Sequence, residues 1–207
     1  MKKKLLFFLG LSFFSAFVFL SYSVHKDLFT QIDFDTTVKL QDNISRRFDT
    51  LFSVFSLFGS VEILSLSLLF LVLINRKVKS AFVLLLYVLT LFFELFGKVF
   101  IVHPGPPYMF FRYDIPFNFP SSYVSPGSSY PSGHSTRTAF VSVILLSLIL
   151  RSKKLSKFQK MAISGLILLF NITMFTSRIY LGEHWISDVL GGALLGYSMA
   201  LIAAAAL

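Results

Sequence analysis

Long apolar runs separated by short polar segments extend along the whole chain. Six of these runs are close to the length of about 20 residues that a helix needs to cross the hydrocarbon core of a bilayer. They cover about residues 5–22, 52–74, 81–101, 134–150, 161–180 and 186–207. Core helices of water-soluble proteins rarely stay apolar over such lengths, so the pattern predicts six membrane-spanning helices.

The composition supports the same class of protein. Of the 207 residues, 55% are hydrophobic and 14% are charged, and the mean hydropathy is +0.75. We therefore expect an all-α polytopic membrane protein, a six-transmembrane-helix bundle that forms a single domain over residues 1–207. The chain contains no cysteine, which excludes disulfides and thiolate metal sites.

The formal net charge of +9 would suit a nucleic-acid partner, but the location of the charges argues against one. Basic residues without any acidic residue gather at the N-terminus, in residues 75–80 and in residues 151–160. These are Lys2, Lys3, Lys4, Arg76, Lys77, Lys79, Arg151, Lys153, Lys154, Lys157 and Lys160. If the six runs alternate in direction, all of them lie on one side of the membrane. The positive-inside rule then predicts a plasma-membrane protein with both termini in the cytoplasm. Because the basic residues are explained by this topology, we expect no nucleic-acid partner.

The first apolar run also fits a secretory signal peptide, with Ser21 and Ser23 as small residues before a cleavage point. Its apolar region is longer than signal peptides usually have, and keeping it gives an even number of spans. We expect this first helix to be retained.

Two longer segments connect the runs on the outer side. Residues 23–51 mix charged and spaced apolar residues, which fits either an amphipathic helix on the outer leaflet or a solvated connector. Residues 102–133 contain all seven prolines, which predicts an irregular loop.

Polar residues interrupt the apolar pattern at three places near the outer ends of the spans. Lys98 ends the third run, residues 132–137 begin the fourth, and the segment "SRIYLGEHWISD", residues 177–188, joins the fifth to the sixth. Because the predicted topology puts all three at the outer face, we expect them to meet in one site.

The residue types in these clusters favour phosphate chemistry. Ser132 and Gly133 precede an apolar helix, whose first N–H groups and dipole attract anions. Arg178 supplies a planar cation suited to phosphate. His184 and Asp188 share a helix face, so the carboxylate can hold one imidazole nitrogen and leave the other as nucleophile or base. Taken singly, each cluster would more often be a capped helix start or an interfacial hydrogen bond.

Metal-activated water fits the sequence less well than a covalent phosphohistidine route. The four histidines form no close His/His/carboxylate set of the kind that zinc prefers. They are His25, His103, His134 and His184.

The spacing of these residues resembles the type 2 phosphatidic acid phosphatase superfamily, membrane relatives of vanadium haloperoxidases. Its second motif, Pro-Ser-Gly-His, is complete at residues 131–134. Its third motif is also complete, with Ser177-Arg178, five residues, His184, three residues and Asp188. The first motif departs from the pattern, because Lys98 is followed after six residues by Gly105 rather than by arginine.

The resemblance implies a role for each matching residue. His184 attacks phosphorus and forms the phosphohistidine, Asp188 orients His184, and His134 protonates the departing lipid oxygen and then activates water. The phosphoryl oxygens are bound by Lys98, Ser132, the Gly133 N–H and Arg178. No cofactor and no metal is implied.

The glycine at position 105 leaves one cation of the family pattern unassigned. Arg137, one turn beyond His134, and Arg112 are equal candidates to supply this phosphate-binding charge, and His103 is a third.

Three acidic residues near the spans also need partners. We expect Glu94 to pair with Lys98, Glu62 to be protonated or hydrogen-bonded in mid-span, and Glu183 to face water.

The sequence thus predicts a metal-independent lipid phosphate or diphosphate phosphatase that acts at the outer face on a membrane lipid. By family analogy undecaprenyl diphosphate is the first candidate substrate, and phosphatidic acid, phosphatidylglycerol phosphate and lipid A phosphates stay open. A lipid phosphotransferase and a non-catalytic lipid-binding or transport protein are the alternatives.

Overall fold

The computed structural model describes residues 3–75, 78–117, 119 and 129–207. Its helices are α1 (Lys3–His25), α2 (Thr30–Asn43), α3 (Asp49–Ser56), α4 (Val61–Asn75), α5 (Val78–Phe100), α6 (Gly133–Arg151), α7 (Lys157–Tyr180) and α8 (Ile186–Ala206). Short 3₁₀ turns lie at Arg46–Phe48, Leu57–Gly59 and Tyr108–Phe110. These ranges contain no strand, and the expected all-α class is confirmed.

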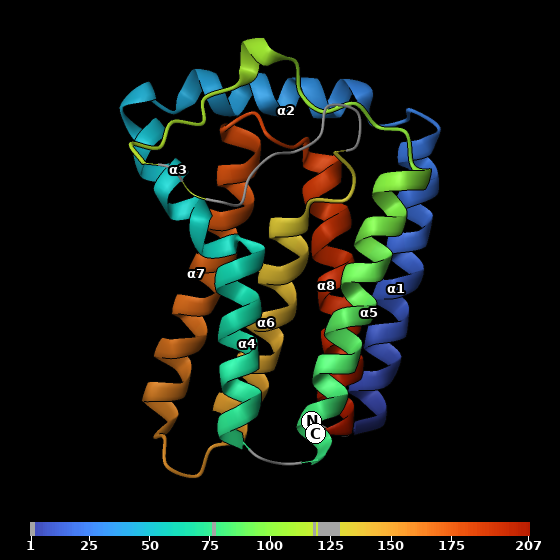
Figure 1. Cartoon of the computed structure of the whole chain (residues 1–207), viewed down its shortest axis with the longest axis vertical. Helices are drawn as coiled ribbons and strands as arrows, with labels where there is room; N and C mark the ends of the chain where they lie inside the picture. The colour runs from blue at the N-terminus through green and yellow to red at the C-terminus, as the bar shows by residue number, and fades with distance from the viewer. Residues whose placement is uncertain (1–2, 76–77, 118, 120–128) are drawn as a thin grey trace.

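Six upright helical segments form the bundle, and α2 lies across one end of it (Figure 1). Five helices are long and apolar enough to cross a membrane. The sixth span is a pair, Arg46–Gly59 and Val61–Ile74, bent by 41°. The span predicted over residues 52–74 is therefore not one continuous helix. Extended backbone at Ser60 interrupts it, and the Ser60 hydroxyl accepts the Ile63 N–H at the start of α4.

The break places Glu62, in the middle of this bent span, in the first turn of α4. Gly59, just before the break, packs against α7 and α6. A Cβ there would lie 2.8 Å from the Met174 sulfur and 3.0 Å from a ring carbon of His134. The bend therefore brings this turn directly against one of the expected catalytic residues.

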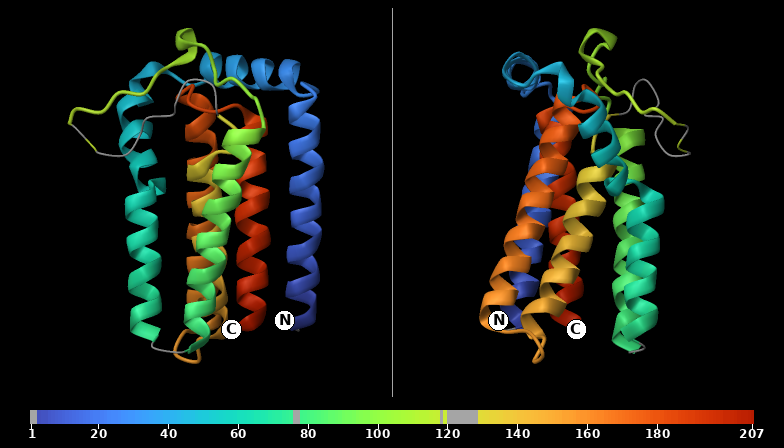
Figure 2. Two further views of the ribbon diagram at one scale, coloured as in Figure 1. Left: turned by 45° about the vertical axis from the view of Figure 1, so that its right-hand side comes forward. Right: turned by 90° about the vertical axis from the view of Figure 1, so that its left-hand side faces the viewer.

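Both termini lie at the end of the bundle opposite α2 (Figures 1 and 2). The turn from α6 to α7 lies at the same end, with the basic residues at its borders. Lys2, Arg76 and Lys77, which also entered the topology prediction, lie outside the described residues. In the predicted loop 102–133, residues 118 and 120–128 lie outside them too, and the described part contains one 3₁₀ turn.

For residues 23–51 the sequence left open an amphipathic helix or a solvated connector, and the structure contains the helix α2 there. A helix does form there, but the residues it buries are polar: Asp33, Thr37 and Gln41. Gln41 donates to the main-chain carbonyls of Phe110 and Tyr180, at 2.7 and 2.8 Å. The buried side of α2 thus covers the end of the bundle with hydrogen-bonding groups.

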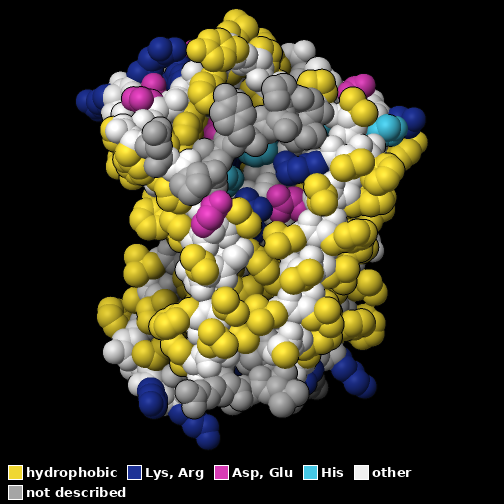
Figure 3. Space-filling view, in the orientation of Figure 1, with side chains coloured by type: hydrophobic (Ala, Val, Ile, Leu, Met, Phe, Trp, Pro, Cys, Tyr) yellow, Lys and Arg dark blue, Asp and Glu magenta, His cyan; other side chains and the backbone are white. Residues whose placement is uncertain are grey.

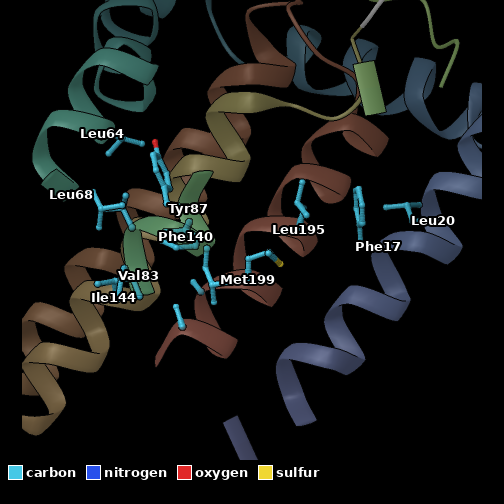
Figure 4. Close-up of a cluster of buried hydrophobic side chains, with 14 of the residues drawn as sticks. Phe17, Leu20, Leu64, Leu68, Val83, Tyr87, Phe140, Ile144, Leu195 and Met199 are labelled. Atoms are coloured by element: carbon cyan, nitrogen blue, oxygen red, sulfur yellow. The ribbon is translucent and has the colours of Figure 1, made fainter. Parts of the chain in front are cut away.

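The hydrophobic core follows the contacts of α8 with α1 and α6 (Figure 4). Phe17 and Leu20 from α1 approach Leu195 and Met199 from α8 in this cluster. Outward-facing apolar side chains stay exposed, for example Phe19 at 72% and Leu166 at 65%. Such exposure is expected of surfaces that contact lipid tails.

Close approach of α6 and α8 depends on Gly196, and we expect Gly196→Ala to destabilise the bundle by about 1–3 kcal/mol. A Cβ at Gly196 would collide with the Thr136 carbonyl oxygen, and it would lie 2.8 Å from the Ala139 Cβ. Gly165→Ala is the matched control, because a Cβ at Gly165 meets nothing within 4 Å. Thermal unfolding in detergent measures both. Equal midpoints for the two variants would contradict the packing argument.

Candidate active site

The three polar clusters of the sequence meet at the end of the bundle beneath α2. Lys98 lies at the end of α5, residues 132–137 begin α6, Arg178 ends α7, and residues 184–188 lead into α8. In the space-filling view, basic, acidic and histidine side chains line a hollow over the upper parts of α4 and α5 (Figure 3). The surface below this hollow is largely apolar, so the polar groups open toward the side of the bundle.

The start of α6 is built as a capped helix that also contacts α8. The Ser132 hydroxyl accepts from the Ser135 N–H at 3.5 Å, and the Ser132 N–H donates to the Asp188 carbonyl at 3.0 Å. The first N–H groups of a helix have no intrahelical acceptor, so they are available to an anion. A Cβ at Gly133 would displace the Glu94 carboxylate and the Arg137 guanidinium from their present positions.

A tight turn after α7 carries the predicted nucleophile. Gly182 has a φ of 69°, which favours glycine, and its α-carbon faces the Phe110 carbonyl. The N–H groups of Glu183 and His184 both donate to the Arg178 carbonyl at 3.2 Å. The turn therefore fixes His184 beside the end of α7 that carries Arg178.

Asp188 holds His184 from the first turn of α8. Its Oδ2 accepts the Trp185 N–H at 2.9 Å and lies 3.4 Å from His184 Nδ1. Burial lowers the pKa of His184 to about 4, against the opposing effect of Asp188 and with the help of the Lys98 and Arg178 charges. His184 is therefore neutral near pH 7. A proton on Nδ1, assigned from the contact with Asp188, leaves the Nε2 lone pair available.

Two acidic residues pair with arginines that the sequence did not assign to them. Glu94 pairs with Arg137 at 3.0 Å, a partner that the sequence did not predict. The carboxylate reaches across to α6 because Gly133 has no side chain in its path. Glu183 is 7% exposed and pairs with Arg178, so the expectation that it faces water is wrong. Burial raises the pKa of Glu183, although the charge of Arg178 opposes the rise.

The remaining predicted site residues lie within electrostatic range of this cluster. The charge of Lys98 interacts with those of Glu94, Asp188, Arg137 and Arg178. His134 interacts with Arg178, Arg137, His184 and Lys98. The structure thus brings together Lys98, Ser132, Gly133, His134, Arg137, Arg178, His184 and Asp188. The neutral imidazole of His184 lies near the charges of Lys98 and Arg178, an arrangement suited to an attack on phosphorus.

The family model described as the PAP2 superfamily matches residues 63–207. The chain belongs to this superfamily. It is 45% identical over 71 residues to phosphatidylglycerophosphatase B of Bacillus subtilis (strain 168), a match that covers 33% of this chain and 34% of that protein. The chain thus spans about a third of the length of the curated relative that it matches.

Two crystal structures share the fold. One, described as the first transmembrane PAP2-type phosphatidylglycerolphosphate phosphatase from Bacillus subtilis, gives a TM-score of 0.76 at 19% identity and covers 94% of this chain and 93% of that one. Aquifex aeolicus LpxE gives a TM-score of 0.62 at 23% identity, over 83% and 94% of the two chains. The six-helix membrane fold is therefore a PAP2 fold.

Of the three candidates to replace the first-motif PAP2 arginine, only Arg137 lies at the centre of the cluster. Arg112 donates to the carbonyls of Gln41 and Ile44 at 3.1 and 3.3 Å, and its guanidinium lies 5.1 Å from the Tyr180 ring centre. It thereby ties the loop after α5 to α2. His103 lies between two carboxylates, as described below. A Cβ at Gly105 would meet only Ser129, at 3.6 Å, so packing does not demand glycine there.

Sequence reasoning gave no place in this PAP2 site to two groups, Asp33 and Glu183. Asp33 of α2 accepts from the N–H of Ser187 at 2.9 Å and from its hydroxyl at 2.8 Å. Glu183 was noticed but assigned to solvent. The only sequence signal for Asp33 was an acid in an amphipathic segment. Among the described residues, no group of three or more His, Asp or Glu side chains is arranged to hold a metal ion.

Proposed function

We propose that this PAP2 protein is an integral membrane lipid phosphatase that forms a phosphohistidine on His184. The observation that carries the proposal is the buried, neutral imidazole of His184, held at Nδ1 by Asp188 beside Arg178. A neutral Nε2 can attack phosphorus, and the nearby cations stabilise the charge that grows on the phosphoryl oxygens.

The proposed reaction has two balanced steps. In the first, Nε2 of His184 forms a bond to phosphorus while the ester bond breaks, and His134 gives a proton to the departing lipid oxygen. In the second, His134 takes a proton from water, the water oxygen bonds to phosphorus, and the phosphorus–nitrogen bond breaks. Asp188 stabilises the positive imidazole of the intermediate. Lys98, Ser132, the Gly133 N–H, Arg137 and Arg178 bind the phosphoryl oxygens.

We propose a glycerophospholipid phosphomonoester, phosphatidylglycerol phosphate first, as the substrate. The curated relative and the structural neighbour with the higher TM-score are both named for activity on that lipid. This support ranks it above undecaprenyl diphosphate, the first candidate from the sequence. The hollow over α4 and α5 opens above an apolar side surface, which supports entry of the lipid from within the membrane (Figure 3).

The proposed orientation places both termini in the cytoplasm of the cell and the site at the outer face of the plasma membrane. The positive-inside rule supports it, because Lys3, Lys4, Arg151 and Lys157 lie at the end of the bundle that holds the termini. A retained α1 is part of the proposal, since the Ser21 hydroxyl bonds that of Tyr130 at 2.8 Å, just before the second motif.

Phosphate release from a panel of lipid phosphates tests the function. Purified protein in EDTA is expected to release phosphate from phosphatidylglycerol phosphate faster than from undecaprenyl diphosphate, phosphatidic acid or a lipid A phosphate. Activity that requires a divalent metal would overturn the mechanism, and a different best substrate would overturn the specificity. Labelled phosphate on a second lipid instead of in solution would identify a phosphotransferase. Release from no lipid would favour a binding or transport role.

The Arg137 side chain is expected to matter for phosphate binding, whereas Arg112 is expected to matter for the loop. Arg137→Ala should lower kcat/KM about 10–100-fold, because a buried charge-assisted contact to the phosphoryl group is lost. Arg112→Ala should lower the thermal midpoint and leave kcat/KM within about threefold. Steady-state kinetics and thermal unfolding of both variants measure this. Full activity of Arg137→Ala would leave the first-motif arginine without a replacement and contradict our assignment.

A further inference from the structure

A histidine that the proposed chemistry does not use lies between two buried carboxylates. The Nε2 atom of His103 lies 3.5 Å from Asp188 Oδ1 and 3.6 Å from Asp33 Oδ2. It also lies 3.3 Å from the Ser187 hydroxyl, which itself donates to Asp33. Asp33 and Asp188 are 1% and 0% exposed, and His103 is 6% exposed. Two carboxylates so far from water need a positive partner.

The two oxygens of Asp188 have different partners. Oδ2 faces His184 and the Trp185 N–H, whereas Oδ1 is buried and has no hydrogen-bond partner among the described residues. The Nε2 atom of His103 lies 3.5 Å from this Oδ1. Because His103 also contacts Asp33, the cap helix α2 is linked through one imidazole to the carboxylate that orients the nucleophile.

From this geometry we propose that His103 and Asp33 are positioning residues that keep Asp188 ionised and aimed at His184. The proposal rests on the proposed function, in which Asp188 must accept the Nδ1 proton of His184. It gives α2 a part in the chemistry, since Asp33 fixes the imidazole that neutralises Asp188.

The charged and titratable surroundings favour a protonated His103. Burial disfavours the imidazolium, but the hydrogen bond to Asp33 and the charges of Asp188, Asp33 and Asp27 outweigh burial and raise the pKa of His103. The Tyr130 ring meets the imidazole edge-on, with 6.4 Å between centres. Groups that face His103 or Asp188 come from the α1–α2 turn, α2, α5, the segment before α6, the α7–α8 turn and α8. They are Asp27, Asp33, Lys98, Tyr130, His184 and Ser187.

Removing the imidazolium would leave two carboxylates near one another with less compensating charge. In His103→Gln we expect them to retain a proton, as paired carboxylates do. A protonated Asp188 can donate to His184 Nδ1, which moves the imidazole proton to Nε2 and blocks attack. Near neutral pH kcat should fall at least about tenfold with KM within about threefold, because the acid limb of kcat should move to above neutral pH.

A second substitution separates this role from simple packing. Asp33→Asn keeps an acceptor for the Ser187 N–H but removes one of the two charges. In Asp33→Asn/His103→Gln only Asp188 is left to ionise, so the acid limb should return toward that of the wild type and kcat should recover at least about threefold over His103→Gln. His25→Gln is the matched control, because His25 is exposed at the end of α1 and should leave the pH profile unchanged.

Nitrogen NMR of histidine-labelled protein measures the pKa values and tautomers of the same histidines without substrate turnover. We expect His103 in the wild type to titrate above the ordinary pKa of histidine, to titrate lower in Asp33→Asn, and His184 to change tautomer in His103→Gln. A double variant no more active than His103→Gln, or an unchanged His184 tautomer, would overturn the proposal. Failure of the wild type to release phosphate from any lipid would instead overturn the proposed function, and the NMR result would still decide this one.

Discussion

Replacing His184 with alanine is expected to lower kcat for phosphate release at least about 10⁴-fold, because it removes the atom that bonds to phosphorus. No other described side chain is both held at Nδ1 by a carboxylate and buried beside Arg178. Substrate binding should change little, since Lys98, Arg178 and the start of α6 remain. Initial rates over a range of substrate concentrations give kcat and KM separately.

Labelling of the protein provides the decisive control for this variant. Wild type mixed with labelled substrate and stopped in alkali should carry label on histidine, and His184→Ala should carry none. His25→Ala, which truncates an exposed histidine at the same end of the bundle, should behave as wild type. Activity of His184→Ala above about 1% of wild type would exclude a covalent role for this residue.

The same nucleophile gives the pH dependence of the free enzyme. Because the pKa of His184 is about 4, protonation removes the Nε2 lone pair only in acid. We therefore expect kcat/KM to fall as pH drops through about 4, and an acid limb near the ordinary histidine pKa of about 6.5 would contradict the burial of this group.

The parts of this structure that the sequence predicted depend on local patterns. The length of the apolar runs predicted the membrane-spanning helices, because a helix needs about 20 apolar residues to cross a bilayer. The second and third motifs predicted a common site because each lies at a span end on the same side. The bend at Ser60 was missed, since residues 52–74 carry no proline and stay mostly apolar.

The missed contacts are those made between elements far apart in the sequence. A local rule pairs Glu94 with Lys98, four residues along the same helix, but it does not predict that the bundle also brings Arg137 of α6 to Glu94. Asp33 and Ser187 are 154 residues apart and meet only because α2 folds over the start of α8. No periodicity within α2 indicates which of its acids is buried.

Replacing Arg178 with methionine is expected to have two separable effects. It removes a fully buried guanidinium from the phosphoryl site, so kcat/KM should fall about 10³-fold. It also leaves the Glu183 carboxylate buried without its partner, which should cost about 3–5 kcal/mol of stability. Steady-state kinetics and unfolding in detergent measure the two effects on the same preparation.

The double variant Arg178→Met/Glu183→Leu distinguishes them. Replacing both members of a buried ion pair with apolar side chains of similar size is often neutral for stability, so its thermal midpoint should return toward wild type. Its activity should stay about 10³-fold down, because the cation for the phosphoryl oxygens is still absent. If activity recovers along with stability, Arg178 acts only through folding. A protein that is stable and inactive would assign Arg178 to phosphate binding, with Glu183 as the group that holds it in place before the substrate arrives.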